Sequence, residues 1–216
     1  KDYLISPINT PQLFVEGNYY LTGQQEEIKN KIINGIDNRE HKIWGIQGSA
    51  GTGKTLLLYD IARTLGQMMR VCVIHSGILS QGHIELNSIL REVDIIPVKE
   101  CNENLIRQYD CILIDESQRL YQVDFDCIVK AFQDLDIHCI FGYDYYQVLS
   151  YAEENRNIPE QLNRLSFFCE NKLSEKIRTN KEVASFIKNV INLAHRPKRY
   201  MDYSNIEVLY AFDYTV

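Results

Sequence analysis

Residues 42–65 read KIWGIQGSAGTGKTLLLYDIARTL, and this stretch decides the fold. An apolar run at 42–46 is followed by a glycine-rich loop, and the loop opens into an apolar-rich helical pattern at 54–65. A strand that passes through a tight turn into a helix is the repeating unit of α/β proteins. The stretch therefore predicts a buried strand, a turn and a helix that packs back against the strand.

The turn matches the pattern GxxxxGK[ST] at every required position. Its eight residues are Gly48, Ser49, Ala50, Gly51, Thr52, Gly53, Lys54 and Thr55. Glycines let backbone N–H groups turn toward phosphate oxygens, and the helix N-terminus adds a positive dipole. We expect this P-loop to bind ATP, with Lys54 at the β- and γ-phosphates and Thr55 binding Mg²⁺ through its hydroxyl. A turn that only joins strand to helix is the alternative.

Residues 111–116, CILIDE, are an apolar strand that ends in two carboxylates. In a parallel sheet these side chains reach the same edge as the P-loop. Asp115 is expected to hold Mg²⁺, directly or through water, and Glu116 to orient and deprotonate an attacking water molecule. A solvated acidic strand end is the alternative. Glu116 favours hydrolysis of ATP over phosphoryl transfer by a kinase.

The remaining pattern alternates strands with helices. Strands are predicted at 42–46, 71–75, 111–114, 139–141 and 165–169, and helices at 24–36, 54–65, 82–90, 125–132 and 181–193. The strand runs are nearly continuous in apolar residues, as expected where both faces of a sheet are covered. We therefore predict an α/β fold with a parallel sheet between helical layers, a three-layer sandwich. Residues 206–212 are one more candidate strand, which either closes an edge or begins a second domain.

Composition excludes several classes of protein. The formal net charge of −6 argues against a protein that coats nucleic acid, although it leaves room for a local binding groove. The six cysteines form no CxxC pair, which indicates a reducing, cytoplasmic compartment and no zinc site. No apolar run approaches the roughly 20 residues of a membrane helix, so a soluble protein is expected. The chain begins at Lys1 without a methionine, so we expect either a piece of a longer protein or a processed product.

Four stretches, taken in order, resemble the motifs of superfamily I helicases. Residues 115–118, DESQ, resemble the DExQ box, and residues 21–25, LTGQQ, resemble the element that precedes the first helix. Residues 141–147, FGYDYYQ, resemble the GDxxQ element, and residues 172–180, KLSEKIRTN, resemble the late arginine element. The chain is most similar to helicase-like ATPases related to the Schlafen group 3 helicase domain. This resemblance implies a RecA-like P-loop NTPase domain at 21–195. Residues 1–20 contain Pro7, Pro11 and Gly17 and show little periodicity, so an irregular lead-in is expected there.

The resemblance also assigns roles to three residues. It implies that Gln25 reads the adenine edge, but Thr22 and Gln25 also spell a capping box, and both interpretations stay open. It implies that Gln147 senses the γ-phosphate, although Tyr143 separates the glycine from the aspartate, and a plain loop is the alternative. It implies that Arg178 neutralises charge on the γ-phosphate; a solvated residue beside a helix cap is the alternative.

The function implied by the resemblance is that of a first motor domain. Single-stranded DNA or RNA is the implied partner, with 71–80 as a contacting element; a loop with a capping serine is the alternative there. A second RecA-like domain is absent from the chain, unless 196–216 are its beginning, and we expect weak ATPase activity from this piece alone. A nucleotide-switched regulatory ATPase that acts on a protein partner without translocation is the alternative function.

Overall fold

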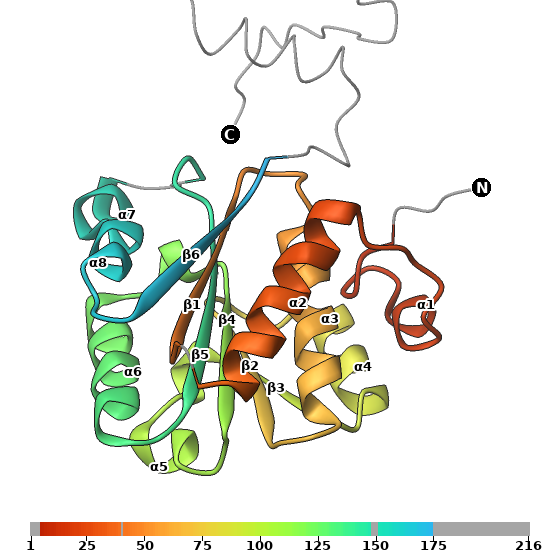
Figure 1. The fold of residues 1–216 in the computed structure, drawn as a ribbon, viewed down its shortest axis with the longest axis horizontal. Coiled ribbons are helices and arrows are strands. Elements are labelled where there is room, and N and C mark those ends of the chain that lie inside the picture. Colours follow the sequence, from red (N-terminus) through yellow and green to blue (C-terminus); the bar gives the residue numbers. More distant parts are fainter. Residues whose placement is uncertain (1–4, 40, 148–150, 175–216) are drawn as a thin grey trace, which may run out of the picture. The chain divides into compact units, whose positions relative to one another are not determined.

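Six strands form one parallel sheet in the spatial order β3-β2-β4-β5-β1-β6 (Figure 1). They are β1 (Ile43–Gly48), β2 (Val71–His75), β3 (Val93–Pro97), β4 (Cys111–Asp115), β5 (His138–Tyr143) and β6 (Phe168–Leu173). The computed structural model describes residues 5–39, 41–147 and 151–174, all of which lie in the first of two compact units, Lys1–Ile177. The predicted helix at 181–193 and strand at 206–212 lie outside the described residues.

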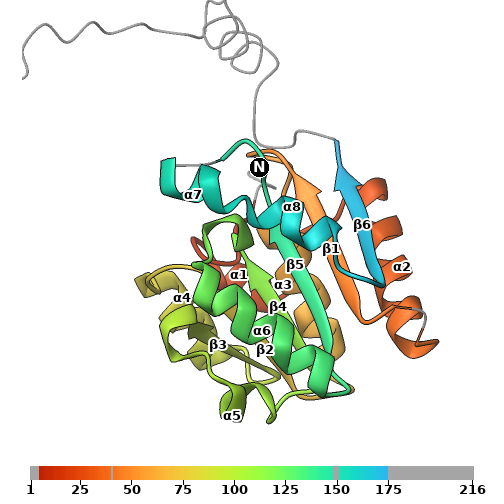
Figure 2. The same ribbon diagram turned by 90° about the vertical axis from the view of Figure 1, so that its left-hand side faces the viewer.

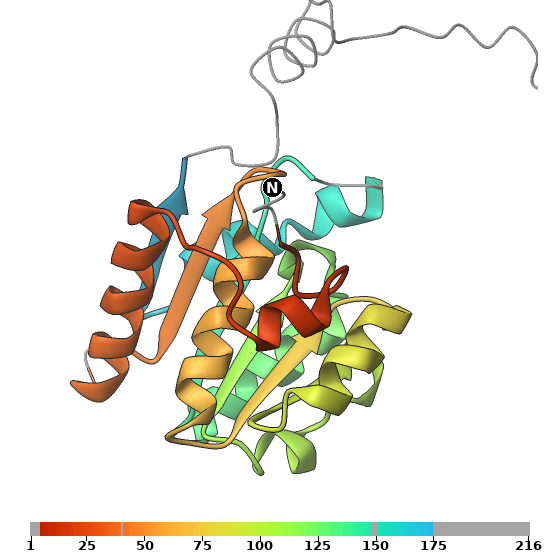
Figure 3. The same cartoon turned by 90° about the vertical axis from the view of Figure 1, so that its right-hand side faces the viewer.

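Helices cover both faces of the sheet (Figures 2 and 3). One side carries α1 (Pro11–Val15), α2 (Gly23–Asp37), α3 (Lys54–Gly66) and α4 (Gln81–Ile89), and the other carries α5 (Glu103–Ile106), α6 (Gln122–Asp134), α7 (Tyr151–Arg156) and α8 (Ile158–Asn163). Two short 3₁₀ turns, η1 (Val98–Glu100) and η2 (Ser117–Arg119), complete the described elements. The three-layer α/β sandwich predicted from the sequence is confirmed. Among the described residues, no helix is long and apolar enough to cross a membrane.

The core forms two apolar clusters, one on each face of the sheet. Trp44 and Ile46 of β1 belong to the cluster under α2 and α3, whereas Ile43 of the same strand belongs to the cluster under α6. Successive side chains of a strand point to opposite faces, so a strand covered on both faces is apolar at nearly every position. This double coverage explains why β1, β2, β4 and β5 are recognisable in the sequence.

The strand β3 is absent from the predicted set. It lies at an edge of the sheet and pairs only with β2 among the described strands. Asp94 is exposed and Pro97 ends the strand, so the run alternates and contains a residue that is tolerated mainly at sheet edges. An edge position therefore removes the continuous apolar signal that identifies the central strands.

The last described strand lies later in the chain than predicted. The run at 165–169 was expected to be the strand, but β6 spans Phe168–Leu173. Its polar residues have specific partners: Asn171 accepts a hydrogen bond from Lys31 Nζ (2.8 Å), and Glu170 accepts one from the Tyr143 hydroxyl (2.6 Å). Polar residues that are satisfied on an edge strand give no apolar pattern, which accounts for the displaced prediction.

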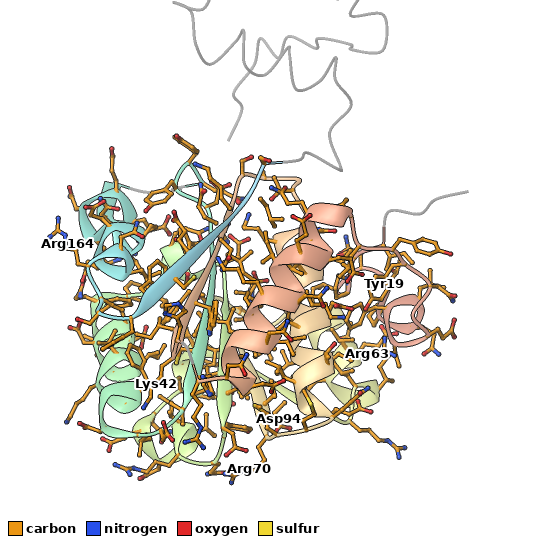
Figure 4. All side chains as sticks on the ribbon, viewed as in Figure 1. Tyr19, Lys42, Arg63, Arg70, Asp94 and Arg164 are labelled. Atoms are coloured by element: carbon orange, nitrogen blue, oxygen red, sulfur yellow. The ribbon has the colours of Figure 1, made fainter. Side chains whose placement is uncertain are left out.

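The lead-in contains the helix α1 and packs on the domain. Phe14 is buried and stacks on Tyr19 with their ring centroids 5.2 Å apart. The Tyr19 hydroxyl donates a hydrogen bond to Asp60, whose carboxylate also pairs with Lys29 Nζ (2.7 Å). Tyr19 and Arg63 lie on the same side of the domain (Figure 4). Part of the segment predicted to be irregular is therefore tied to α2 and α3.

Candidate functional site

The P-loop joins the carboxyl end of β1 to the start of α3. Gly51 and Gly53 have φ angles of 82° and 79°, in the left-handed region that glycine adopts without strain. Gly53 is the residue that precedes α3, so no side chain at the cap position competes for the first N–H groups of the helix. The helix N-terminus therefore presents its amides and its positive dipole at the carboxyl edge of the sheet.

Thr52 fixes the shape of the loop from inside. It is fully buried; its hydroxyl donates to the Ser49 carbonyl oxygen (2.8 Å), and its N–H donates to the same oxygen (3.3 Å). Gly48 lies so close that a Cβ there would stand 2.5 Å from Thr52 Oγ1. The loop thus requires glycine at this position for steric reasons.

Gln25 connects α2 to this loop. Its Oε1 accepts the Thr22 N–H (2.9 Å), and its own N–H donates to Thr22 Oγ1 (3.3 Å), so the capping box is formed. The carboxamide nitrogen lies 3.3 Å from the Thr52 carbonyl oxygen and 3.4 Å from that of Gly53, both in hydrogen-bonding geometry. The capping interpretation is confirmed, and the adenine-reading role stays a prediction.

Asp115 ends β4, and β5 lies between this strand and β1. Asp115 is only 2% exposed, and the Thr55 hydroxyl is close enough to its carboxylate to lower the pKa of that group. Burial and the charge of Glu116 raise the pKa of Asp115 to about 7, against the opposing effects of Lys54 and the Thr55 hydroxyl. A buried carboxylate is stabilised in its charged form by a nearby cation, and hydroxyl and carboxylate oxygens are ligands that Mg²⁺ accepts. The residues present therefore fit a magnesium ion.

Glu116 follows with a φ of 56°, a left-handed conformation that is strained for a residue with a side chain. Its Oε2 accepts a hydrogen bond from Gln118 Nε2 (2.7 Å) and lies 3.6 Å from Arg119 Nε. The backbone turn and these two partners fix the direction of the carboxylate at the edge of the sheet.

Gln118 links this carboxylate to the loop after β5. Its Oε1 accepts the Asp144 N–H (3.2 Å), and Asp144 Oδ1 accepts the Tyr146 N–H (2.9 Å). Gln147 follows, half-buried, in the same loop. Sequence reasoning gave Gln118 no role, because the spacing in DESQ does not reveal where the amide points. Arg178 lies outside the described residues.

The segment 71–80 forms β2 and the turn after it. Ser76 Oγ donates to the Asp115 carbonyl oxygen (2.9 Å), which places the turn beside the carboxylates. Ser80 precedes α4, and its N–H donates to His83 Nδ1 (3.1 Å), so His83 contributes to the cap of this helix. Contact of this segment with nucleic acid stays a prediction.

His83 is expected to make the fold sensitive to acid. Burial and the adjacent His75 ring, 4.4 Å away between centroids, lower the pKa of His83 from 6.5 to about 4. Because the folded state favours the neutral ring, its contribution to stability is present above pH 6.5 and is lost as the pH falls toward 4. We expect His83→Gln, which keeps an N3 side chain suited to a capping box, to remove roughly 1–2 kcal/mol of this loss, allowing for solvent screening. Urea unfolding at pH values from 7.5 to 4.5 measures the free energy of unfolding of the wild type and of the variant. If both free energies fall equally with pH, His83 is not the source of the acid sensitivity.

Comparison with solved structures shows a shared fold. A Pif1 helicase unwinding forked DNA matches with a TM-score of 0.53 and 16% identity, covering 80% of this chain and 48% of that chain. Bacteroides Pif1 bound to ssDNA matches with a TM-score of 0.51 and 17% identity, covering 81% and 46%. The large terminase of a thermophilic bacteriophage matches with a TM-score of 0.51 and 11% identity, covering 79% and 50%. The chain thus spans about half the length of these proteins, and its fold is that of a helicase-like P-loop NTPase.

No curated protein matches the sequence as a relative. The family described as Schlafen group 3, DNA/RNA helicase domain, matches residues 41–210, which is most of the chain. The matched range contains the P-loop, the DESQ stretch and the DYYQ stretch. The chain belongs to the Schlafen group 3 DNA/RNA helicase domain family.

Proposed function

We propose that this chain binds ATP with Mg²⁺ and hydrolyses it as the first motor domain of a helicase-like nucleic-acid translocase. The observation that carries the proposal is the buried Asp115 carboxylate beside the P-loop, close enough to Thr55 and Lys54 for both to lower its pKa. Two oxygen ligands that are 60 residues apart in sequence meet next to a loop whose glycines are shaped for phosphate. This arrangement suits a triphosphate and its metal ion.

Each residue of the site has a distinct task. The amides of the P-loop and Lys54 bind the β- and γ-phosphates, and Thr55 and Asp115 hold Mg²⁺. Bound Mg²⁺ would neutralise charge on the phosphate oxygens. Glu116 accepts the proton of the attacking water, and Gln118 holds the carboxylate in place for that transfer.

Coupling to the rest of the motor involves two more residues. We propose that Gln147 senses the γ-phosphate, because Gln118 and Asp144 join its loop to the Glu116 carboxylate. We propose that Arg178 supplies positive charge to the γ-phosphate, a role that rests on the resemblance of 172–180 to the late arginine element of helicases.

The proposed partner is single-stranded DNA or RNA. Bacteroides Pif1, which shares the fold, was solved bound to ssDNA. In this chain Tyr146 is 87% exposed and Tyr121 is 65% exposed, and Arg156 lies 4.8 Å from the centroid of the Tyr121 ring. Exposed aromatic rings are surfaces on which unpaired bases stack. A second RecA-like domain would complete the motor, with 21–195 as the first domain and 196–216 leading toward the second.

The function is tested by ATP hydrolysis in the complete gene product. We expect single-stranded DNA or RNA to raise kcat at least about tenfold, because closure of the motor on a strand completes the catalytic site. The Glu116→Gln protein, measured with the same strands, is the matched control for contaminating ATPases. Steady hydrolysis that responds to neither nucleic acid would favour the regulatory ATPase that acts on a protein partner.

A further inference from the structure

The side chain of Gln25 has no exposed surface. Its oxygen is engaged by the Thr22 N–H, and its nitrogen by the Thr52 and Gly53 carbonyl oxygens. The amide NH₂ group is the donor of this side chain, and here it faces two main-chain acceptors of the P-loop. Because Gln25 is fully buried, a base arriving from solvent meets no exposed donor on it.

The two carbonyls that Gln25 holds determine the direction of two amides. Within a trans peptide unit the C=O and the N–H point in opposite directions. Holding the Thr52 carbonyl toward α2 therefore turns the Gly53 N–H away from α2, and holding the Gly53 carbonyl does the same for the Lys54 N–H. These N–H groups belong to the turn that leads into α3, where a P-loop presents its amides to phosphate.

The other contacts of the loop leave the Thr52 carbonyl to Gln25, whereas the Gly53 carbonyl is shared between Gln25 and the first turn of α3. Thr52 uses its hydroxyl and its N–H on the Ser49 carbonyl, which closes the turn but does not fix the Thr52 carbonyl. The Gly53 carbonyl also accepts the Leu57 N–H (3.0 Å), the first hydrogen bond of α3. Thr52 is fully buried, so its carbonyl oxygen would be left without a hydrogen-bond donor if the Gln25 side chain turned outward to a base.

We infer that Gln25 is a positioning residue of the phosphate-binding loop and that it does not select the base. This inference rests on the proposed binding of a triphosphate at residues 48–55. The inference concerns every ligand that carries a triphosphate, because Gln25 then supports the binding of ATP, of GTP and of a bare triphosphate to the same degree. Any preference among nucleobases then comes from other residues.

Two variants of Gln25 test this role, and the one change that they have in common is the loss of the amide N–H donors of the side chain. Gln25→Glu keeps the acceptor for the Thr22 N–H and so keeps the capping box, but it adds a carboxyl group. Gln25→Met adds no charge but gives up that acceptor. Thr22→Val is the matched control, because it removes the hydroxyl that caps α2 and leaves both Gln25 contacts with the P-loop in place.

Calorimetric titration with ATP, GTP and tripolyphosphate, each with Mg²⁺, tests the inference. We expect both Gln25 variants to bind all three at least about tenfold more weakly, by factors that agree within about twofold, since a buried acceptor loses its partner whatever the ligand carries. Thr22→Val should change each Kd by less than about threefold. Amide hydrogen exchange without nucleotide should become faster at Gly53 and Lys54 in the Gln25 variants alone.

The contrary outcomes are distinct. Weaker binding of ATP with unchanged binding of tripolyphosphate would show that Gln25 reads adenine, and unchanged binding of all three ligands would show that it positions nothing; either result overturns the inference. A wild-type protein that binds none of the three ligands would refute the proposed function, and the inference with it. Should a Gln25 variant fold poorly, the other variant and the exchange rates still decide the question.

Discussion

Replacing Lys54 with alanine is expected to weaken the binding of Mg-ATP by about 100-fold or more. Lys54 is the first residue of α3 and is 6% exposed, so its side chain lies along the site rather than in solvent. It is close enough to lower the pKa of Asp115, which places its charge near the proposed metal position. Loss of a desolvated charge opposite a triphosphate removes several charge-assisted contacts, each worth about 1.5–3 kcal/mol.

Calorimetric titration with Mg-ATP measures this effect, with Lys42→Ala as the control. Lys42 lies just before β1, at the end of the strand away from the P-loop, and pairs on the surface with Asp136 (2.7 Å). Its removal is expected to leave the Kd for ATP unchanged, because exposed ion pairs contribute little even to stability. A Lys54→Ala protein that binds ATP within about threefold of the wild type would show that the phosphates lie elsewhere.

Replacing Glu116 with glutamine is expected to preserve ATP binding and to lower kcat by about 100-fold or more. The amide keeps the size of the side chain and an oxygen that accepts from Gln118, but it cannot take a proton from water. General base catalysis contributes typically about 10²–10⁴-fold. The pattern of unchanged Kd and reduced kcat separates a base from a residue that only binds ATP.

Paired measurements of ATP binding and single-turnover hydrolysis test this assignment. Glu103→Gln serves as the control, because Glu103 pairs with Arg107 on the exposed surface of α5. Turnover retained in Glu116→Gln would remove the residue from the role of base, and a raised Kd with unchanged kcat would make it a binding residue.

The central strands and the motif positions were predictable, whereas the edges were not. β1, β2, β4 and β5 are covered on both faces and therefore carry continuous apolar runs. β3 and β6 lie at the edges, where Asp94, Pro97 and Asn171 interrupt that signal. The periodicity of a sequence reports how many faces of a strand are buried, and an edge strand offers less of this information.

The sequence predicts which positions along the chain belong to the candidate site, but it does not predict which side chains contact one another there. GSAGTGKT and DESQ predict a glycine-rich loop and two carboxylates at the carboxyl end of the sheet, and Thr55 is close enough to Asp115 to lower the pKa of that carboxylate. The direction of the Gln25 amide depends on carbonyls 27 and 28 residues away, and that of Gln118 on an N–H 26 residues away. Such contacts depend on rotamers that the packed fold selects, and no local spacing encodes them.

The most direct measurement is a crystal structure of the protein with a non-hydrolysable ATP analogue and Mn²⁺ in place of Mg²⁺, read by anomalous scattering. We expect the triphosphate to lie along the amides of residues 48–55, with a single manganese peak between the Thr55 hydroxyl and the Asp115 carboxylate. A nucleotide bound at another face, or a manganese peak away from both side chains, would contradict the assignment of this edge as an ATP site.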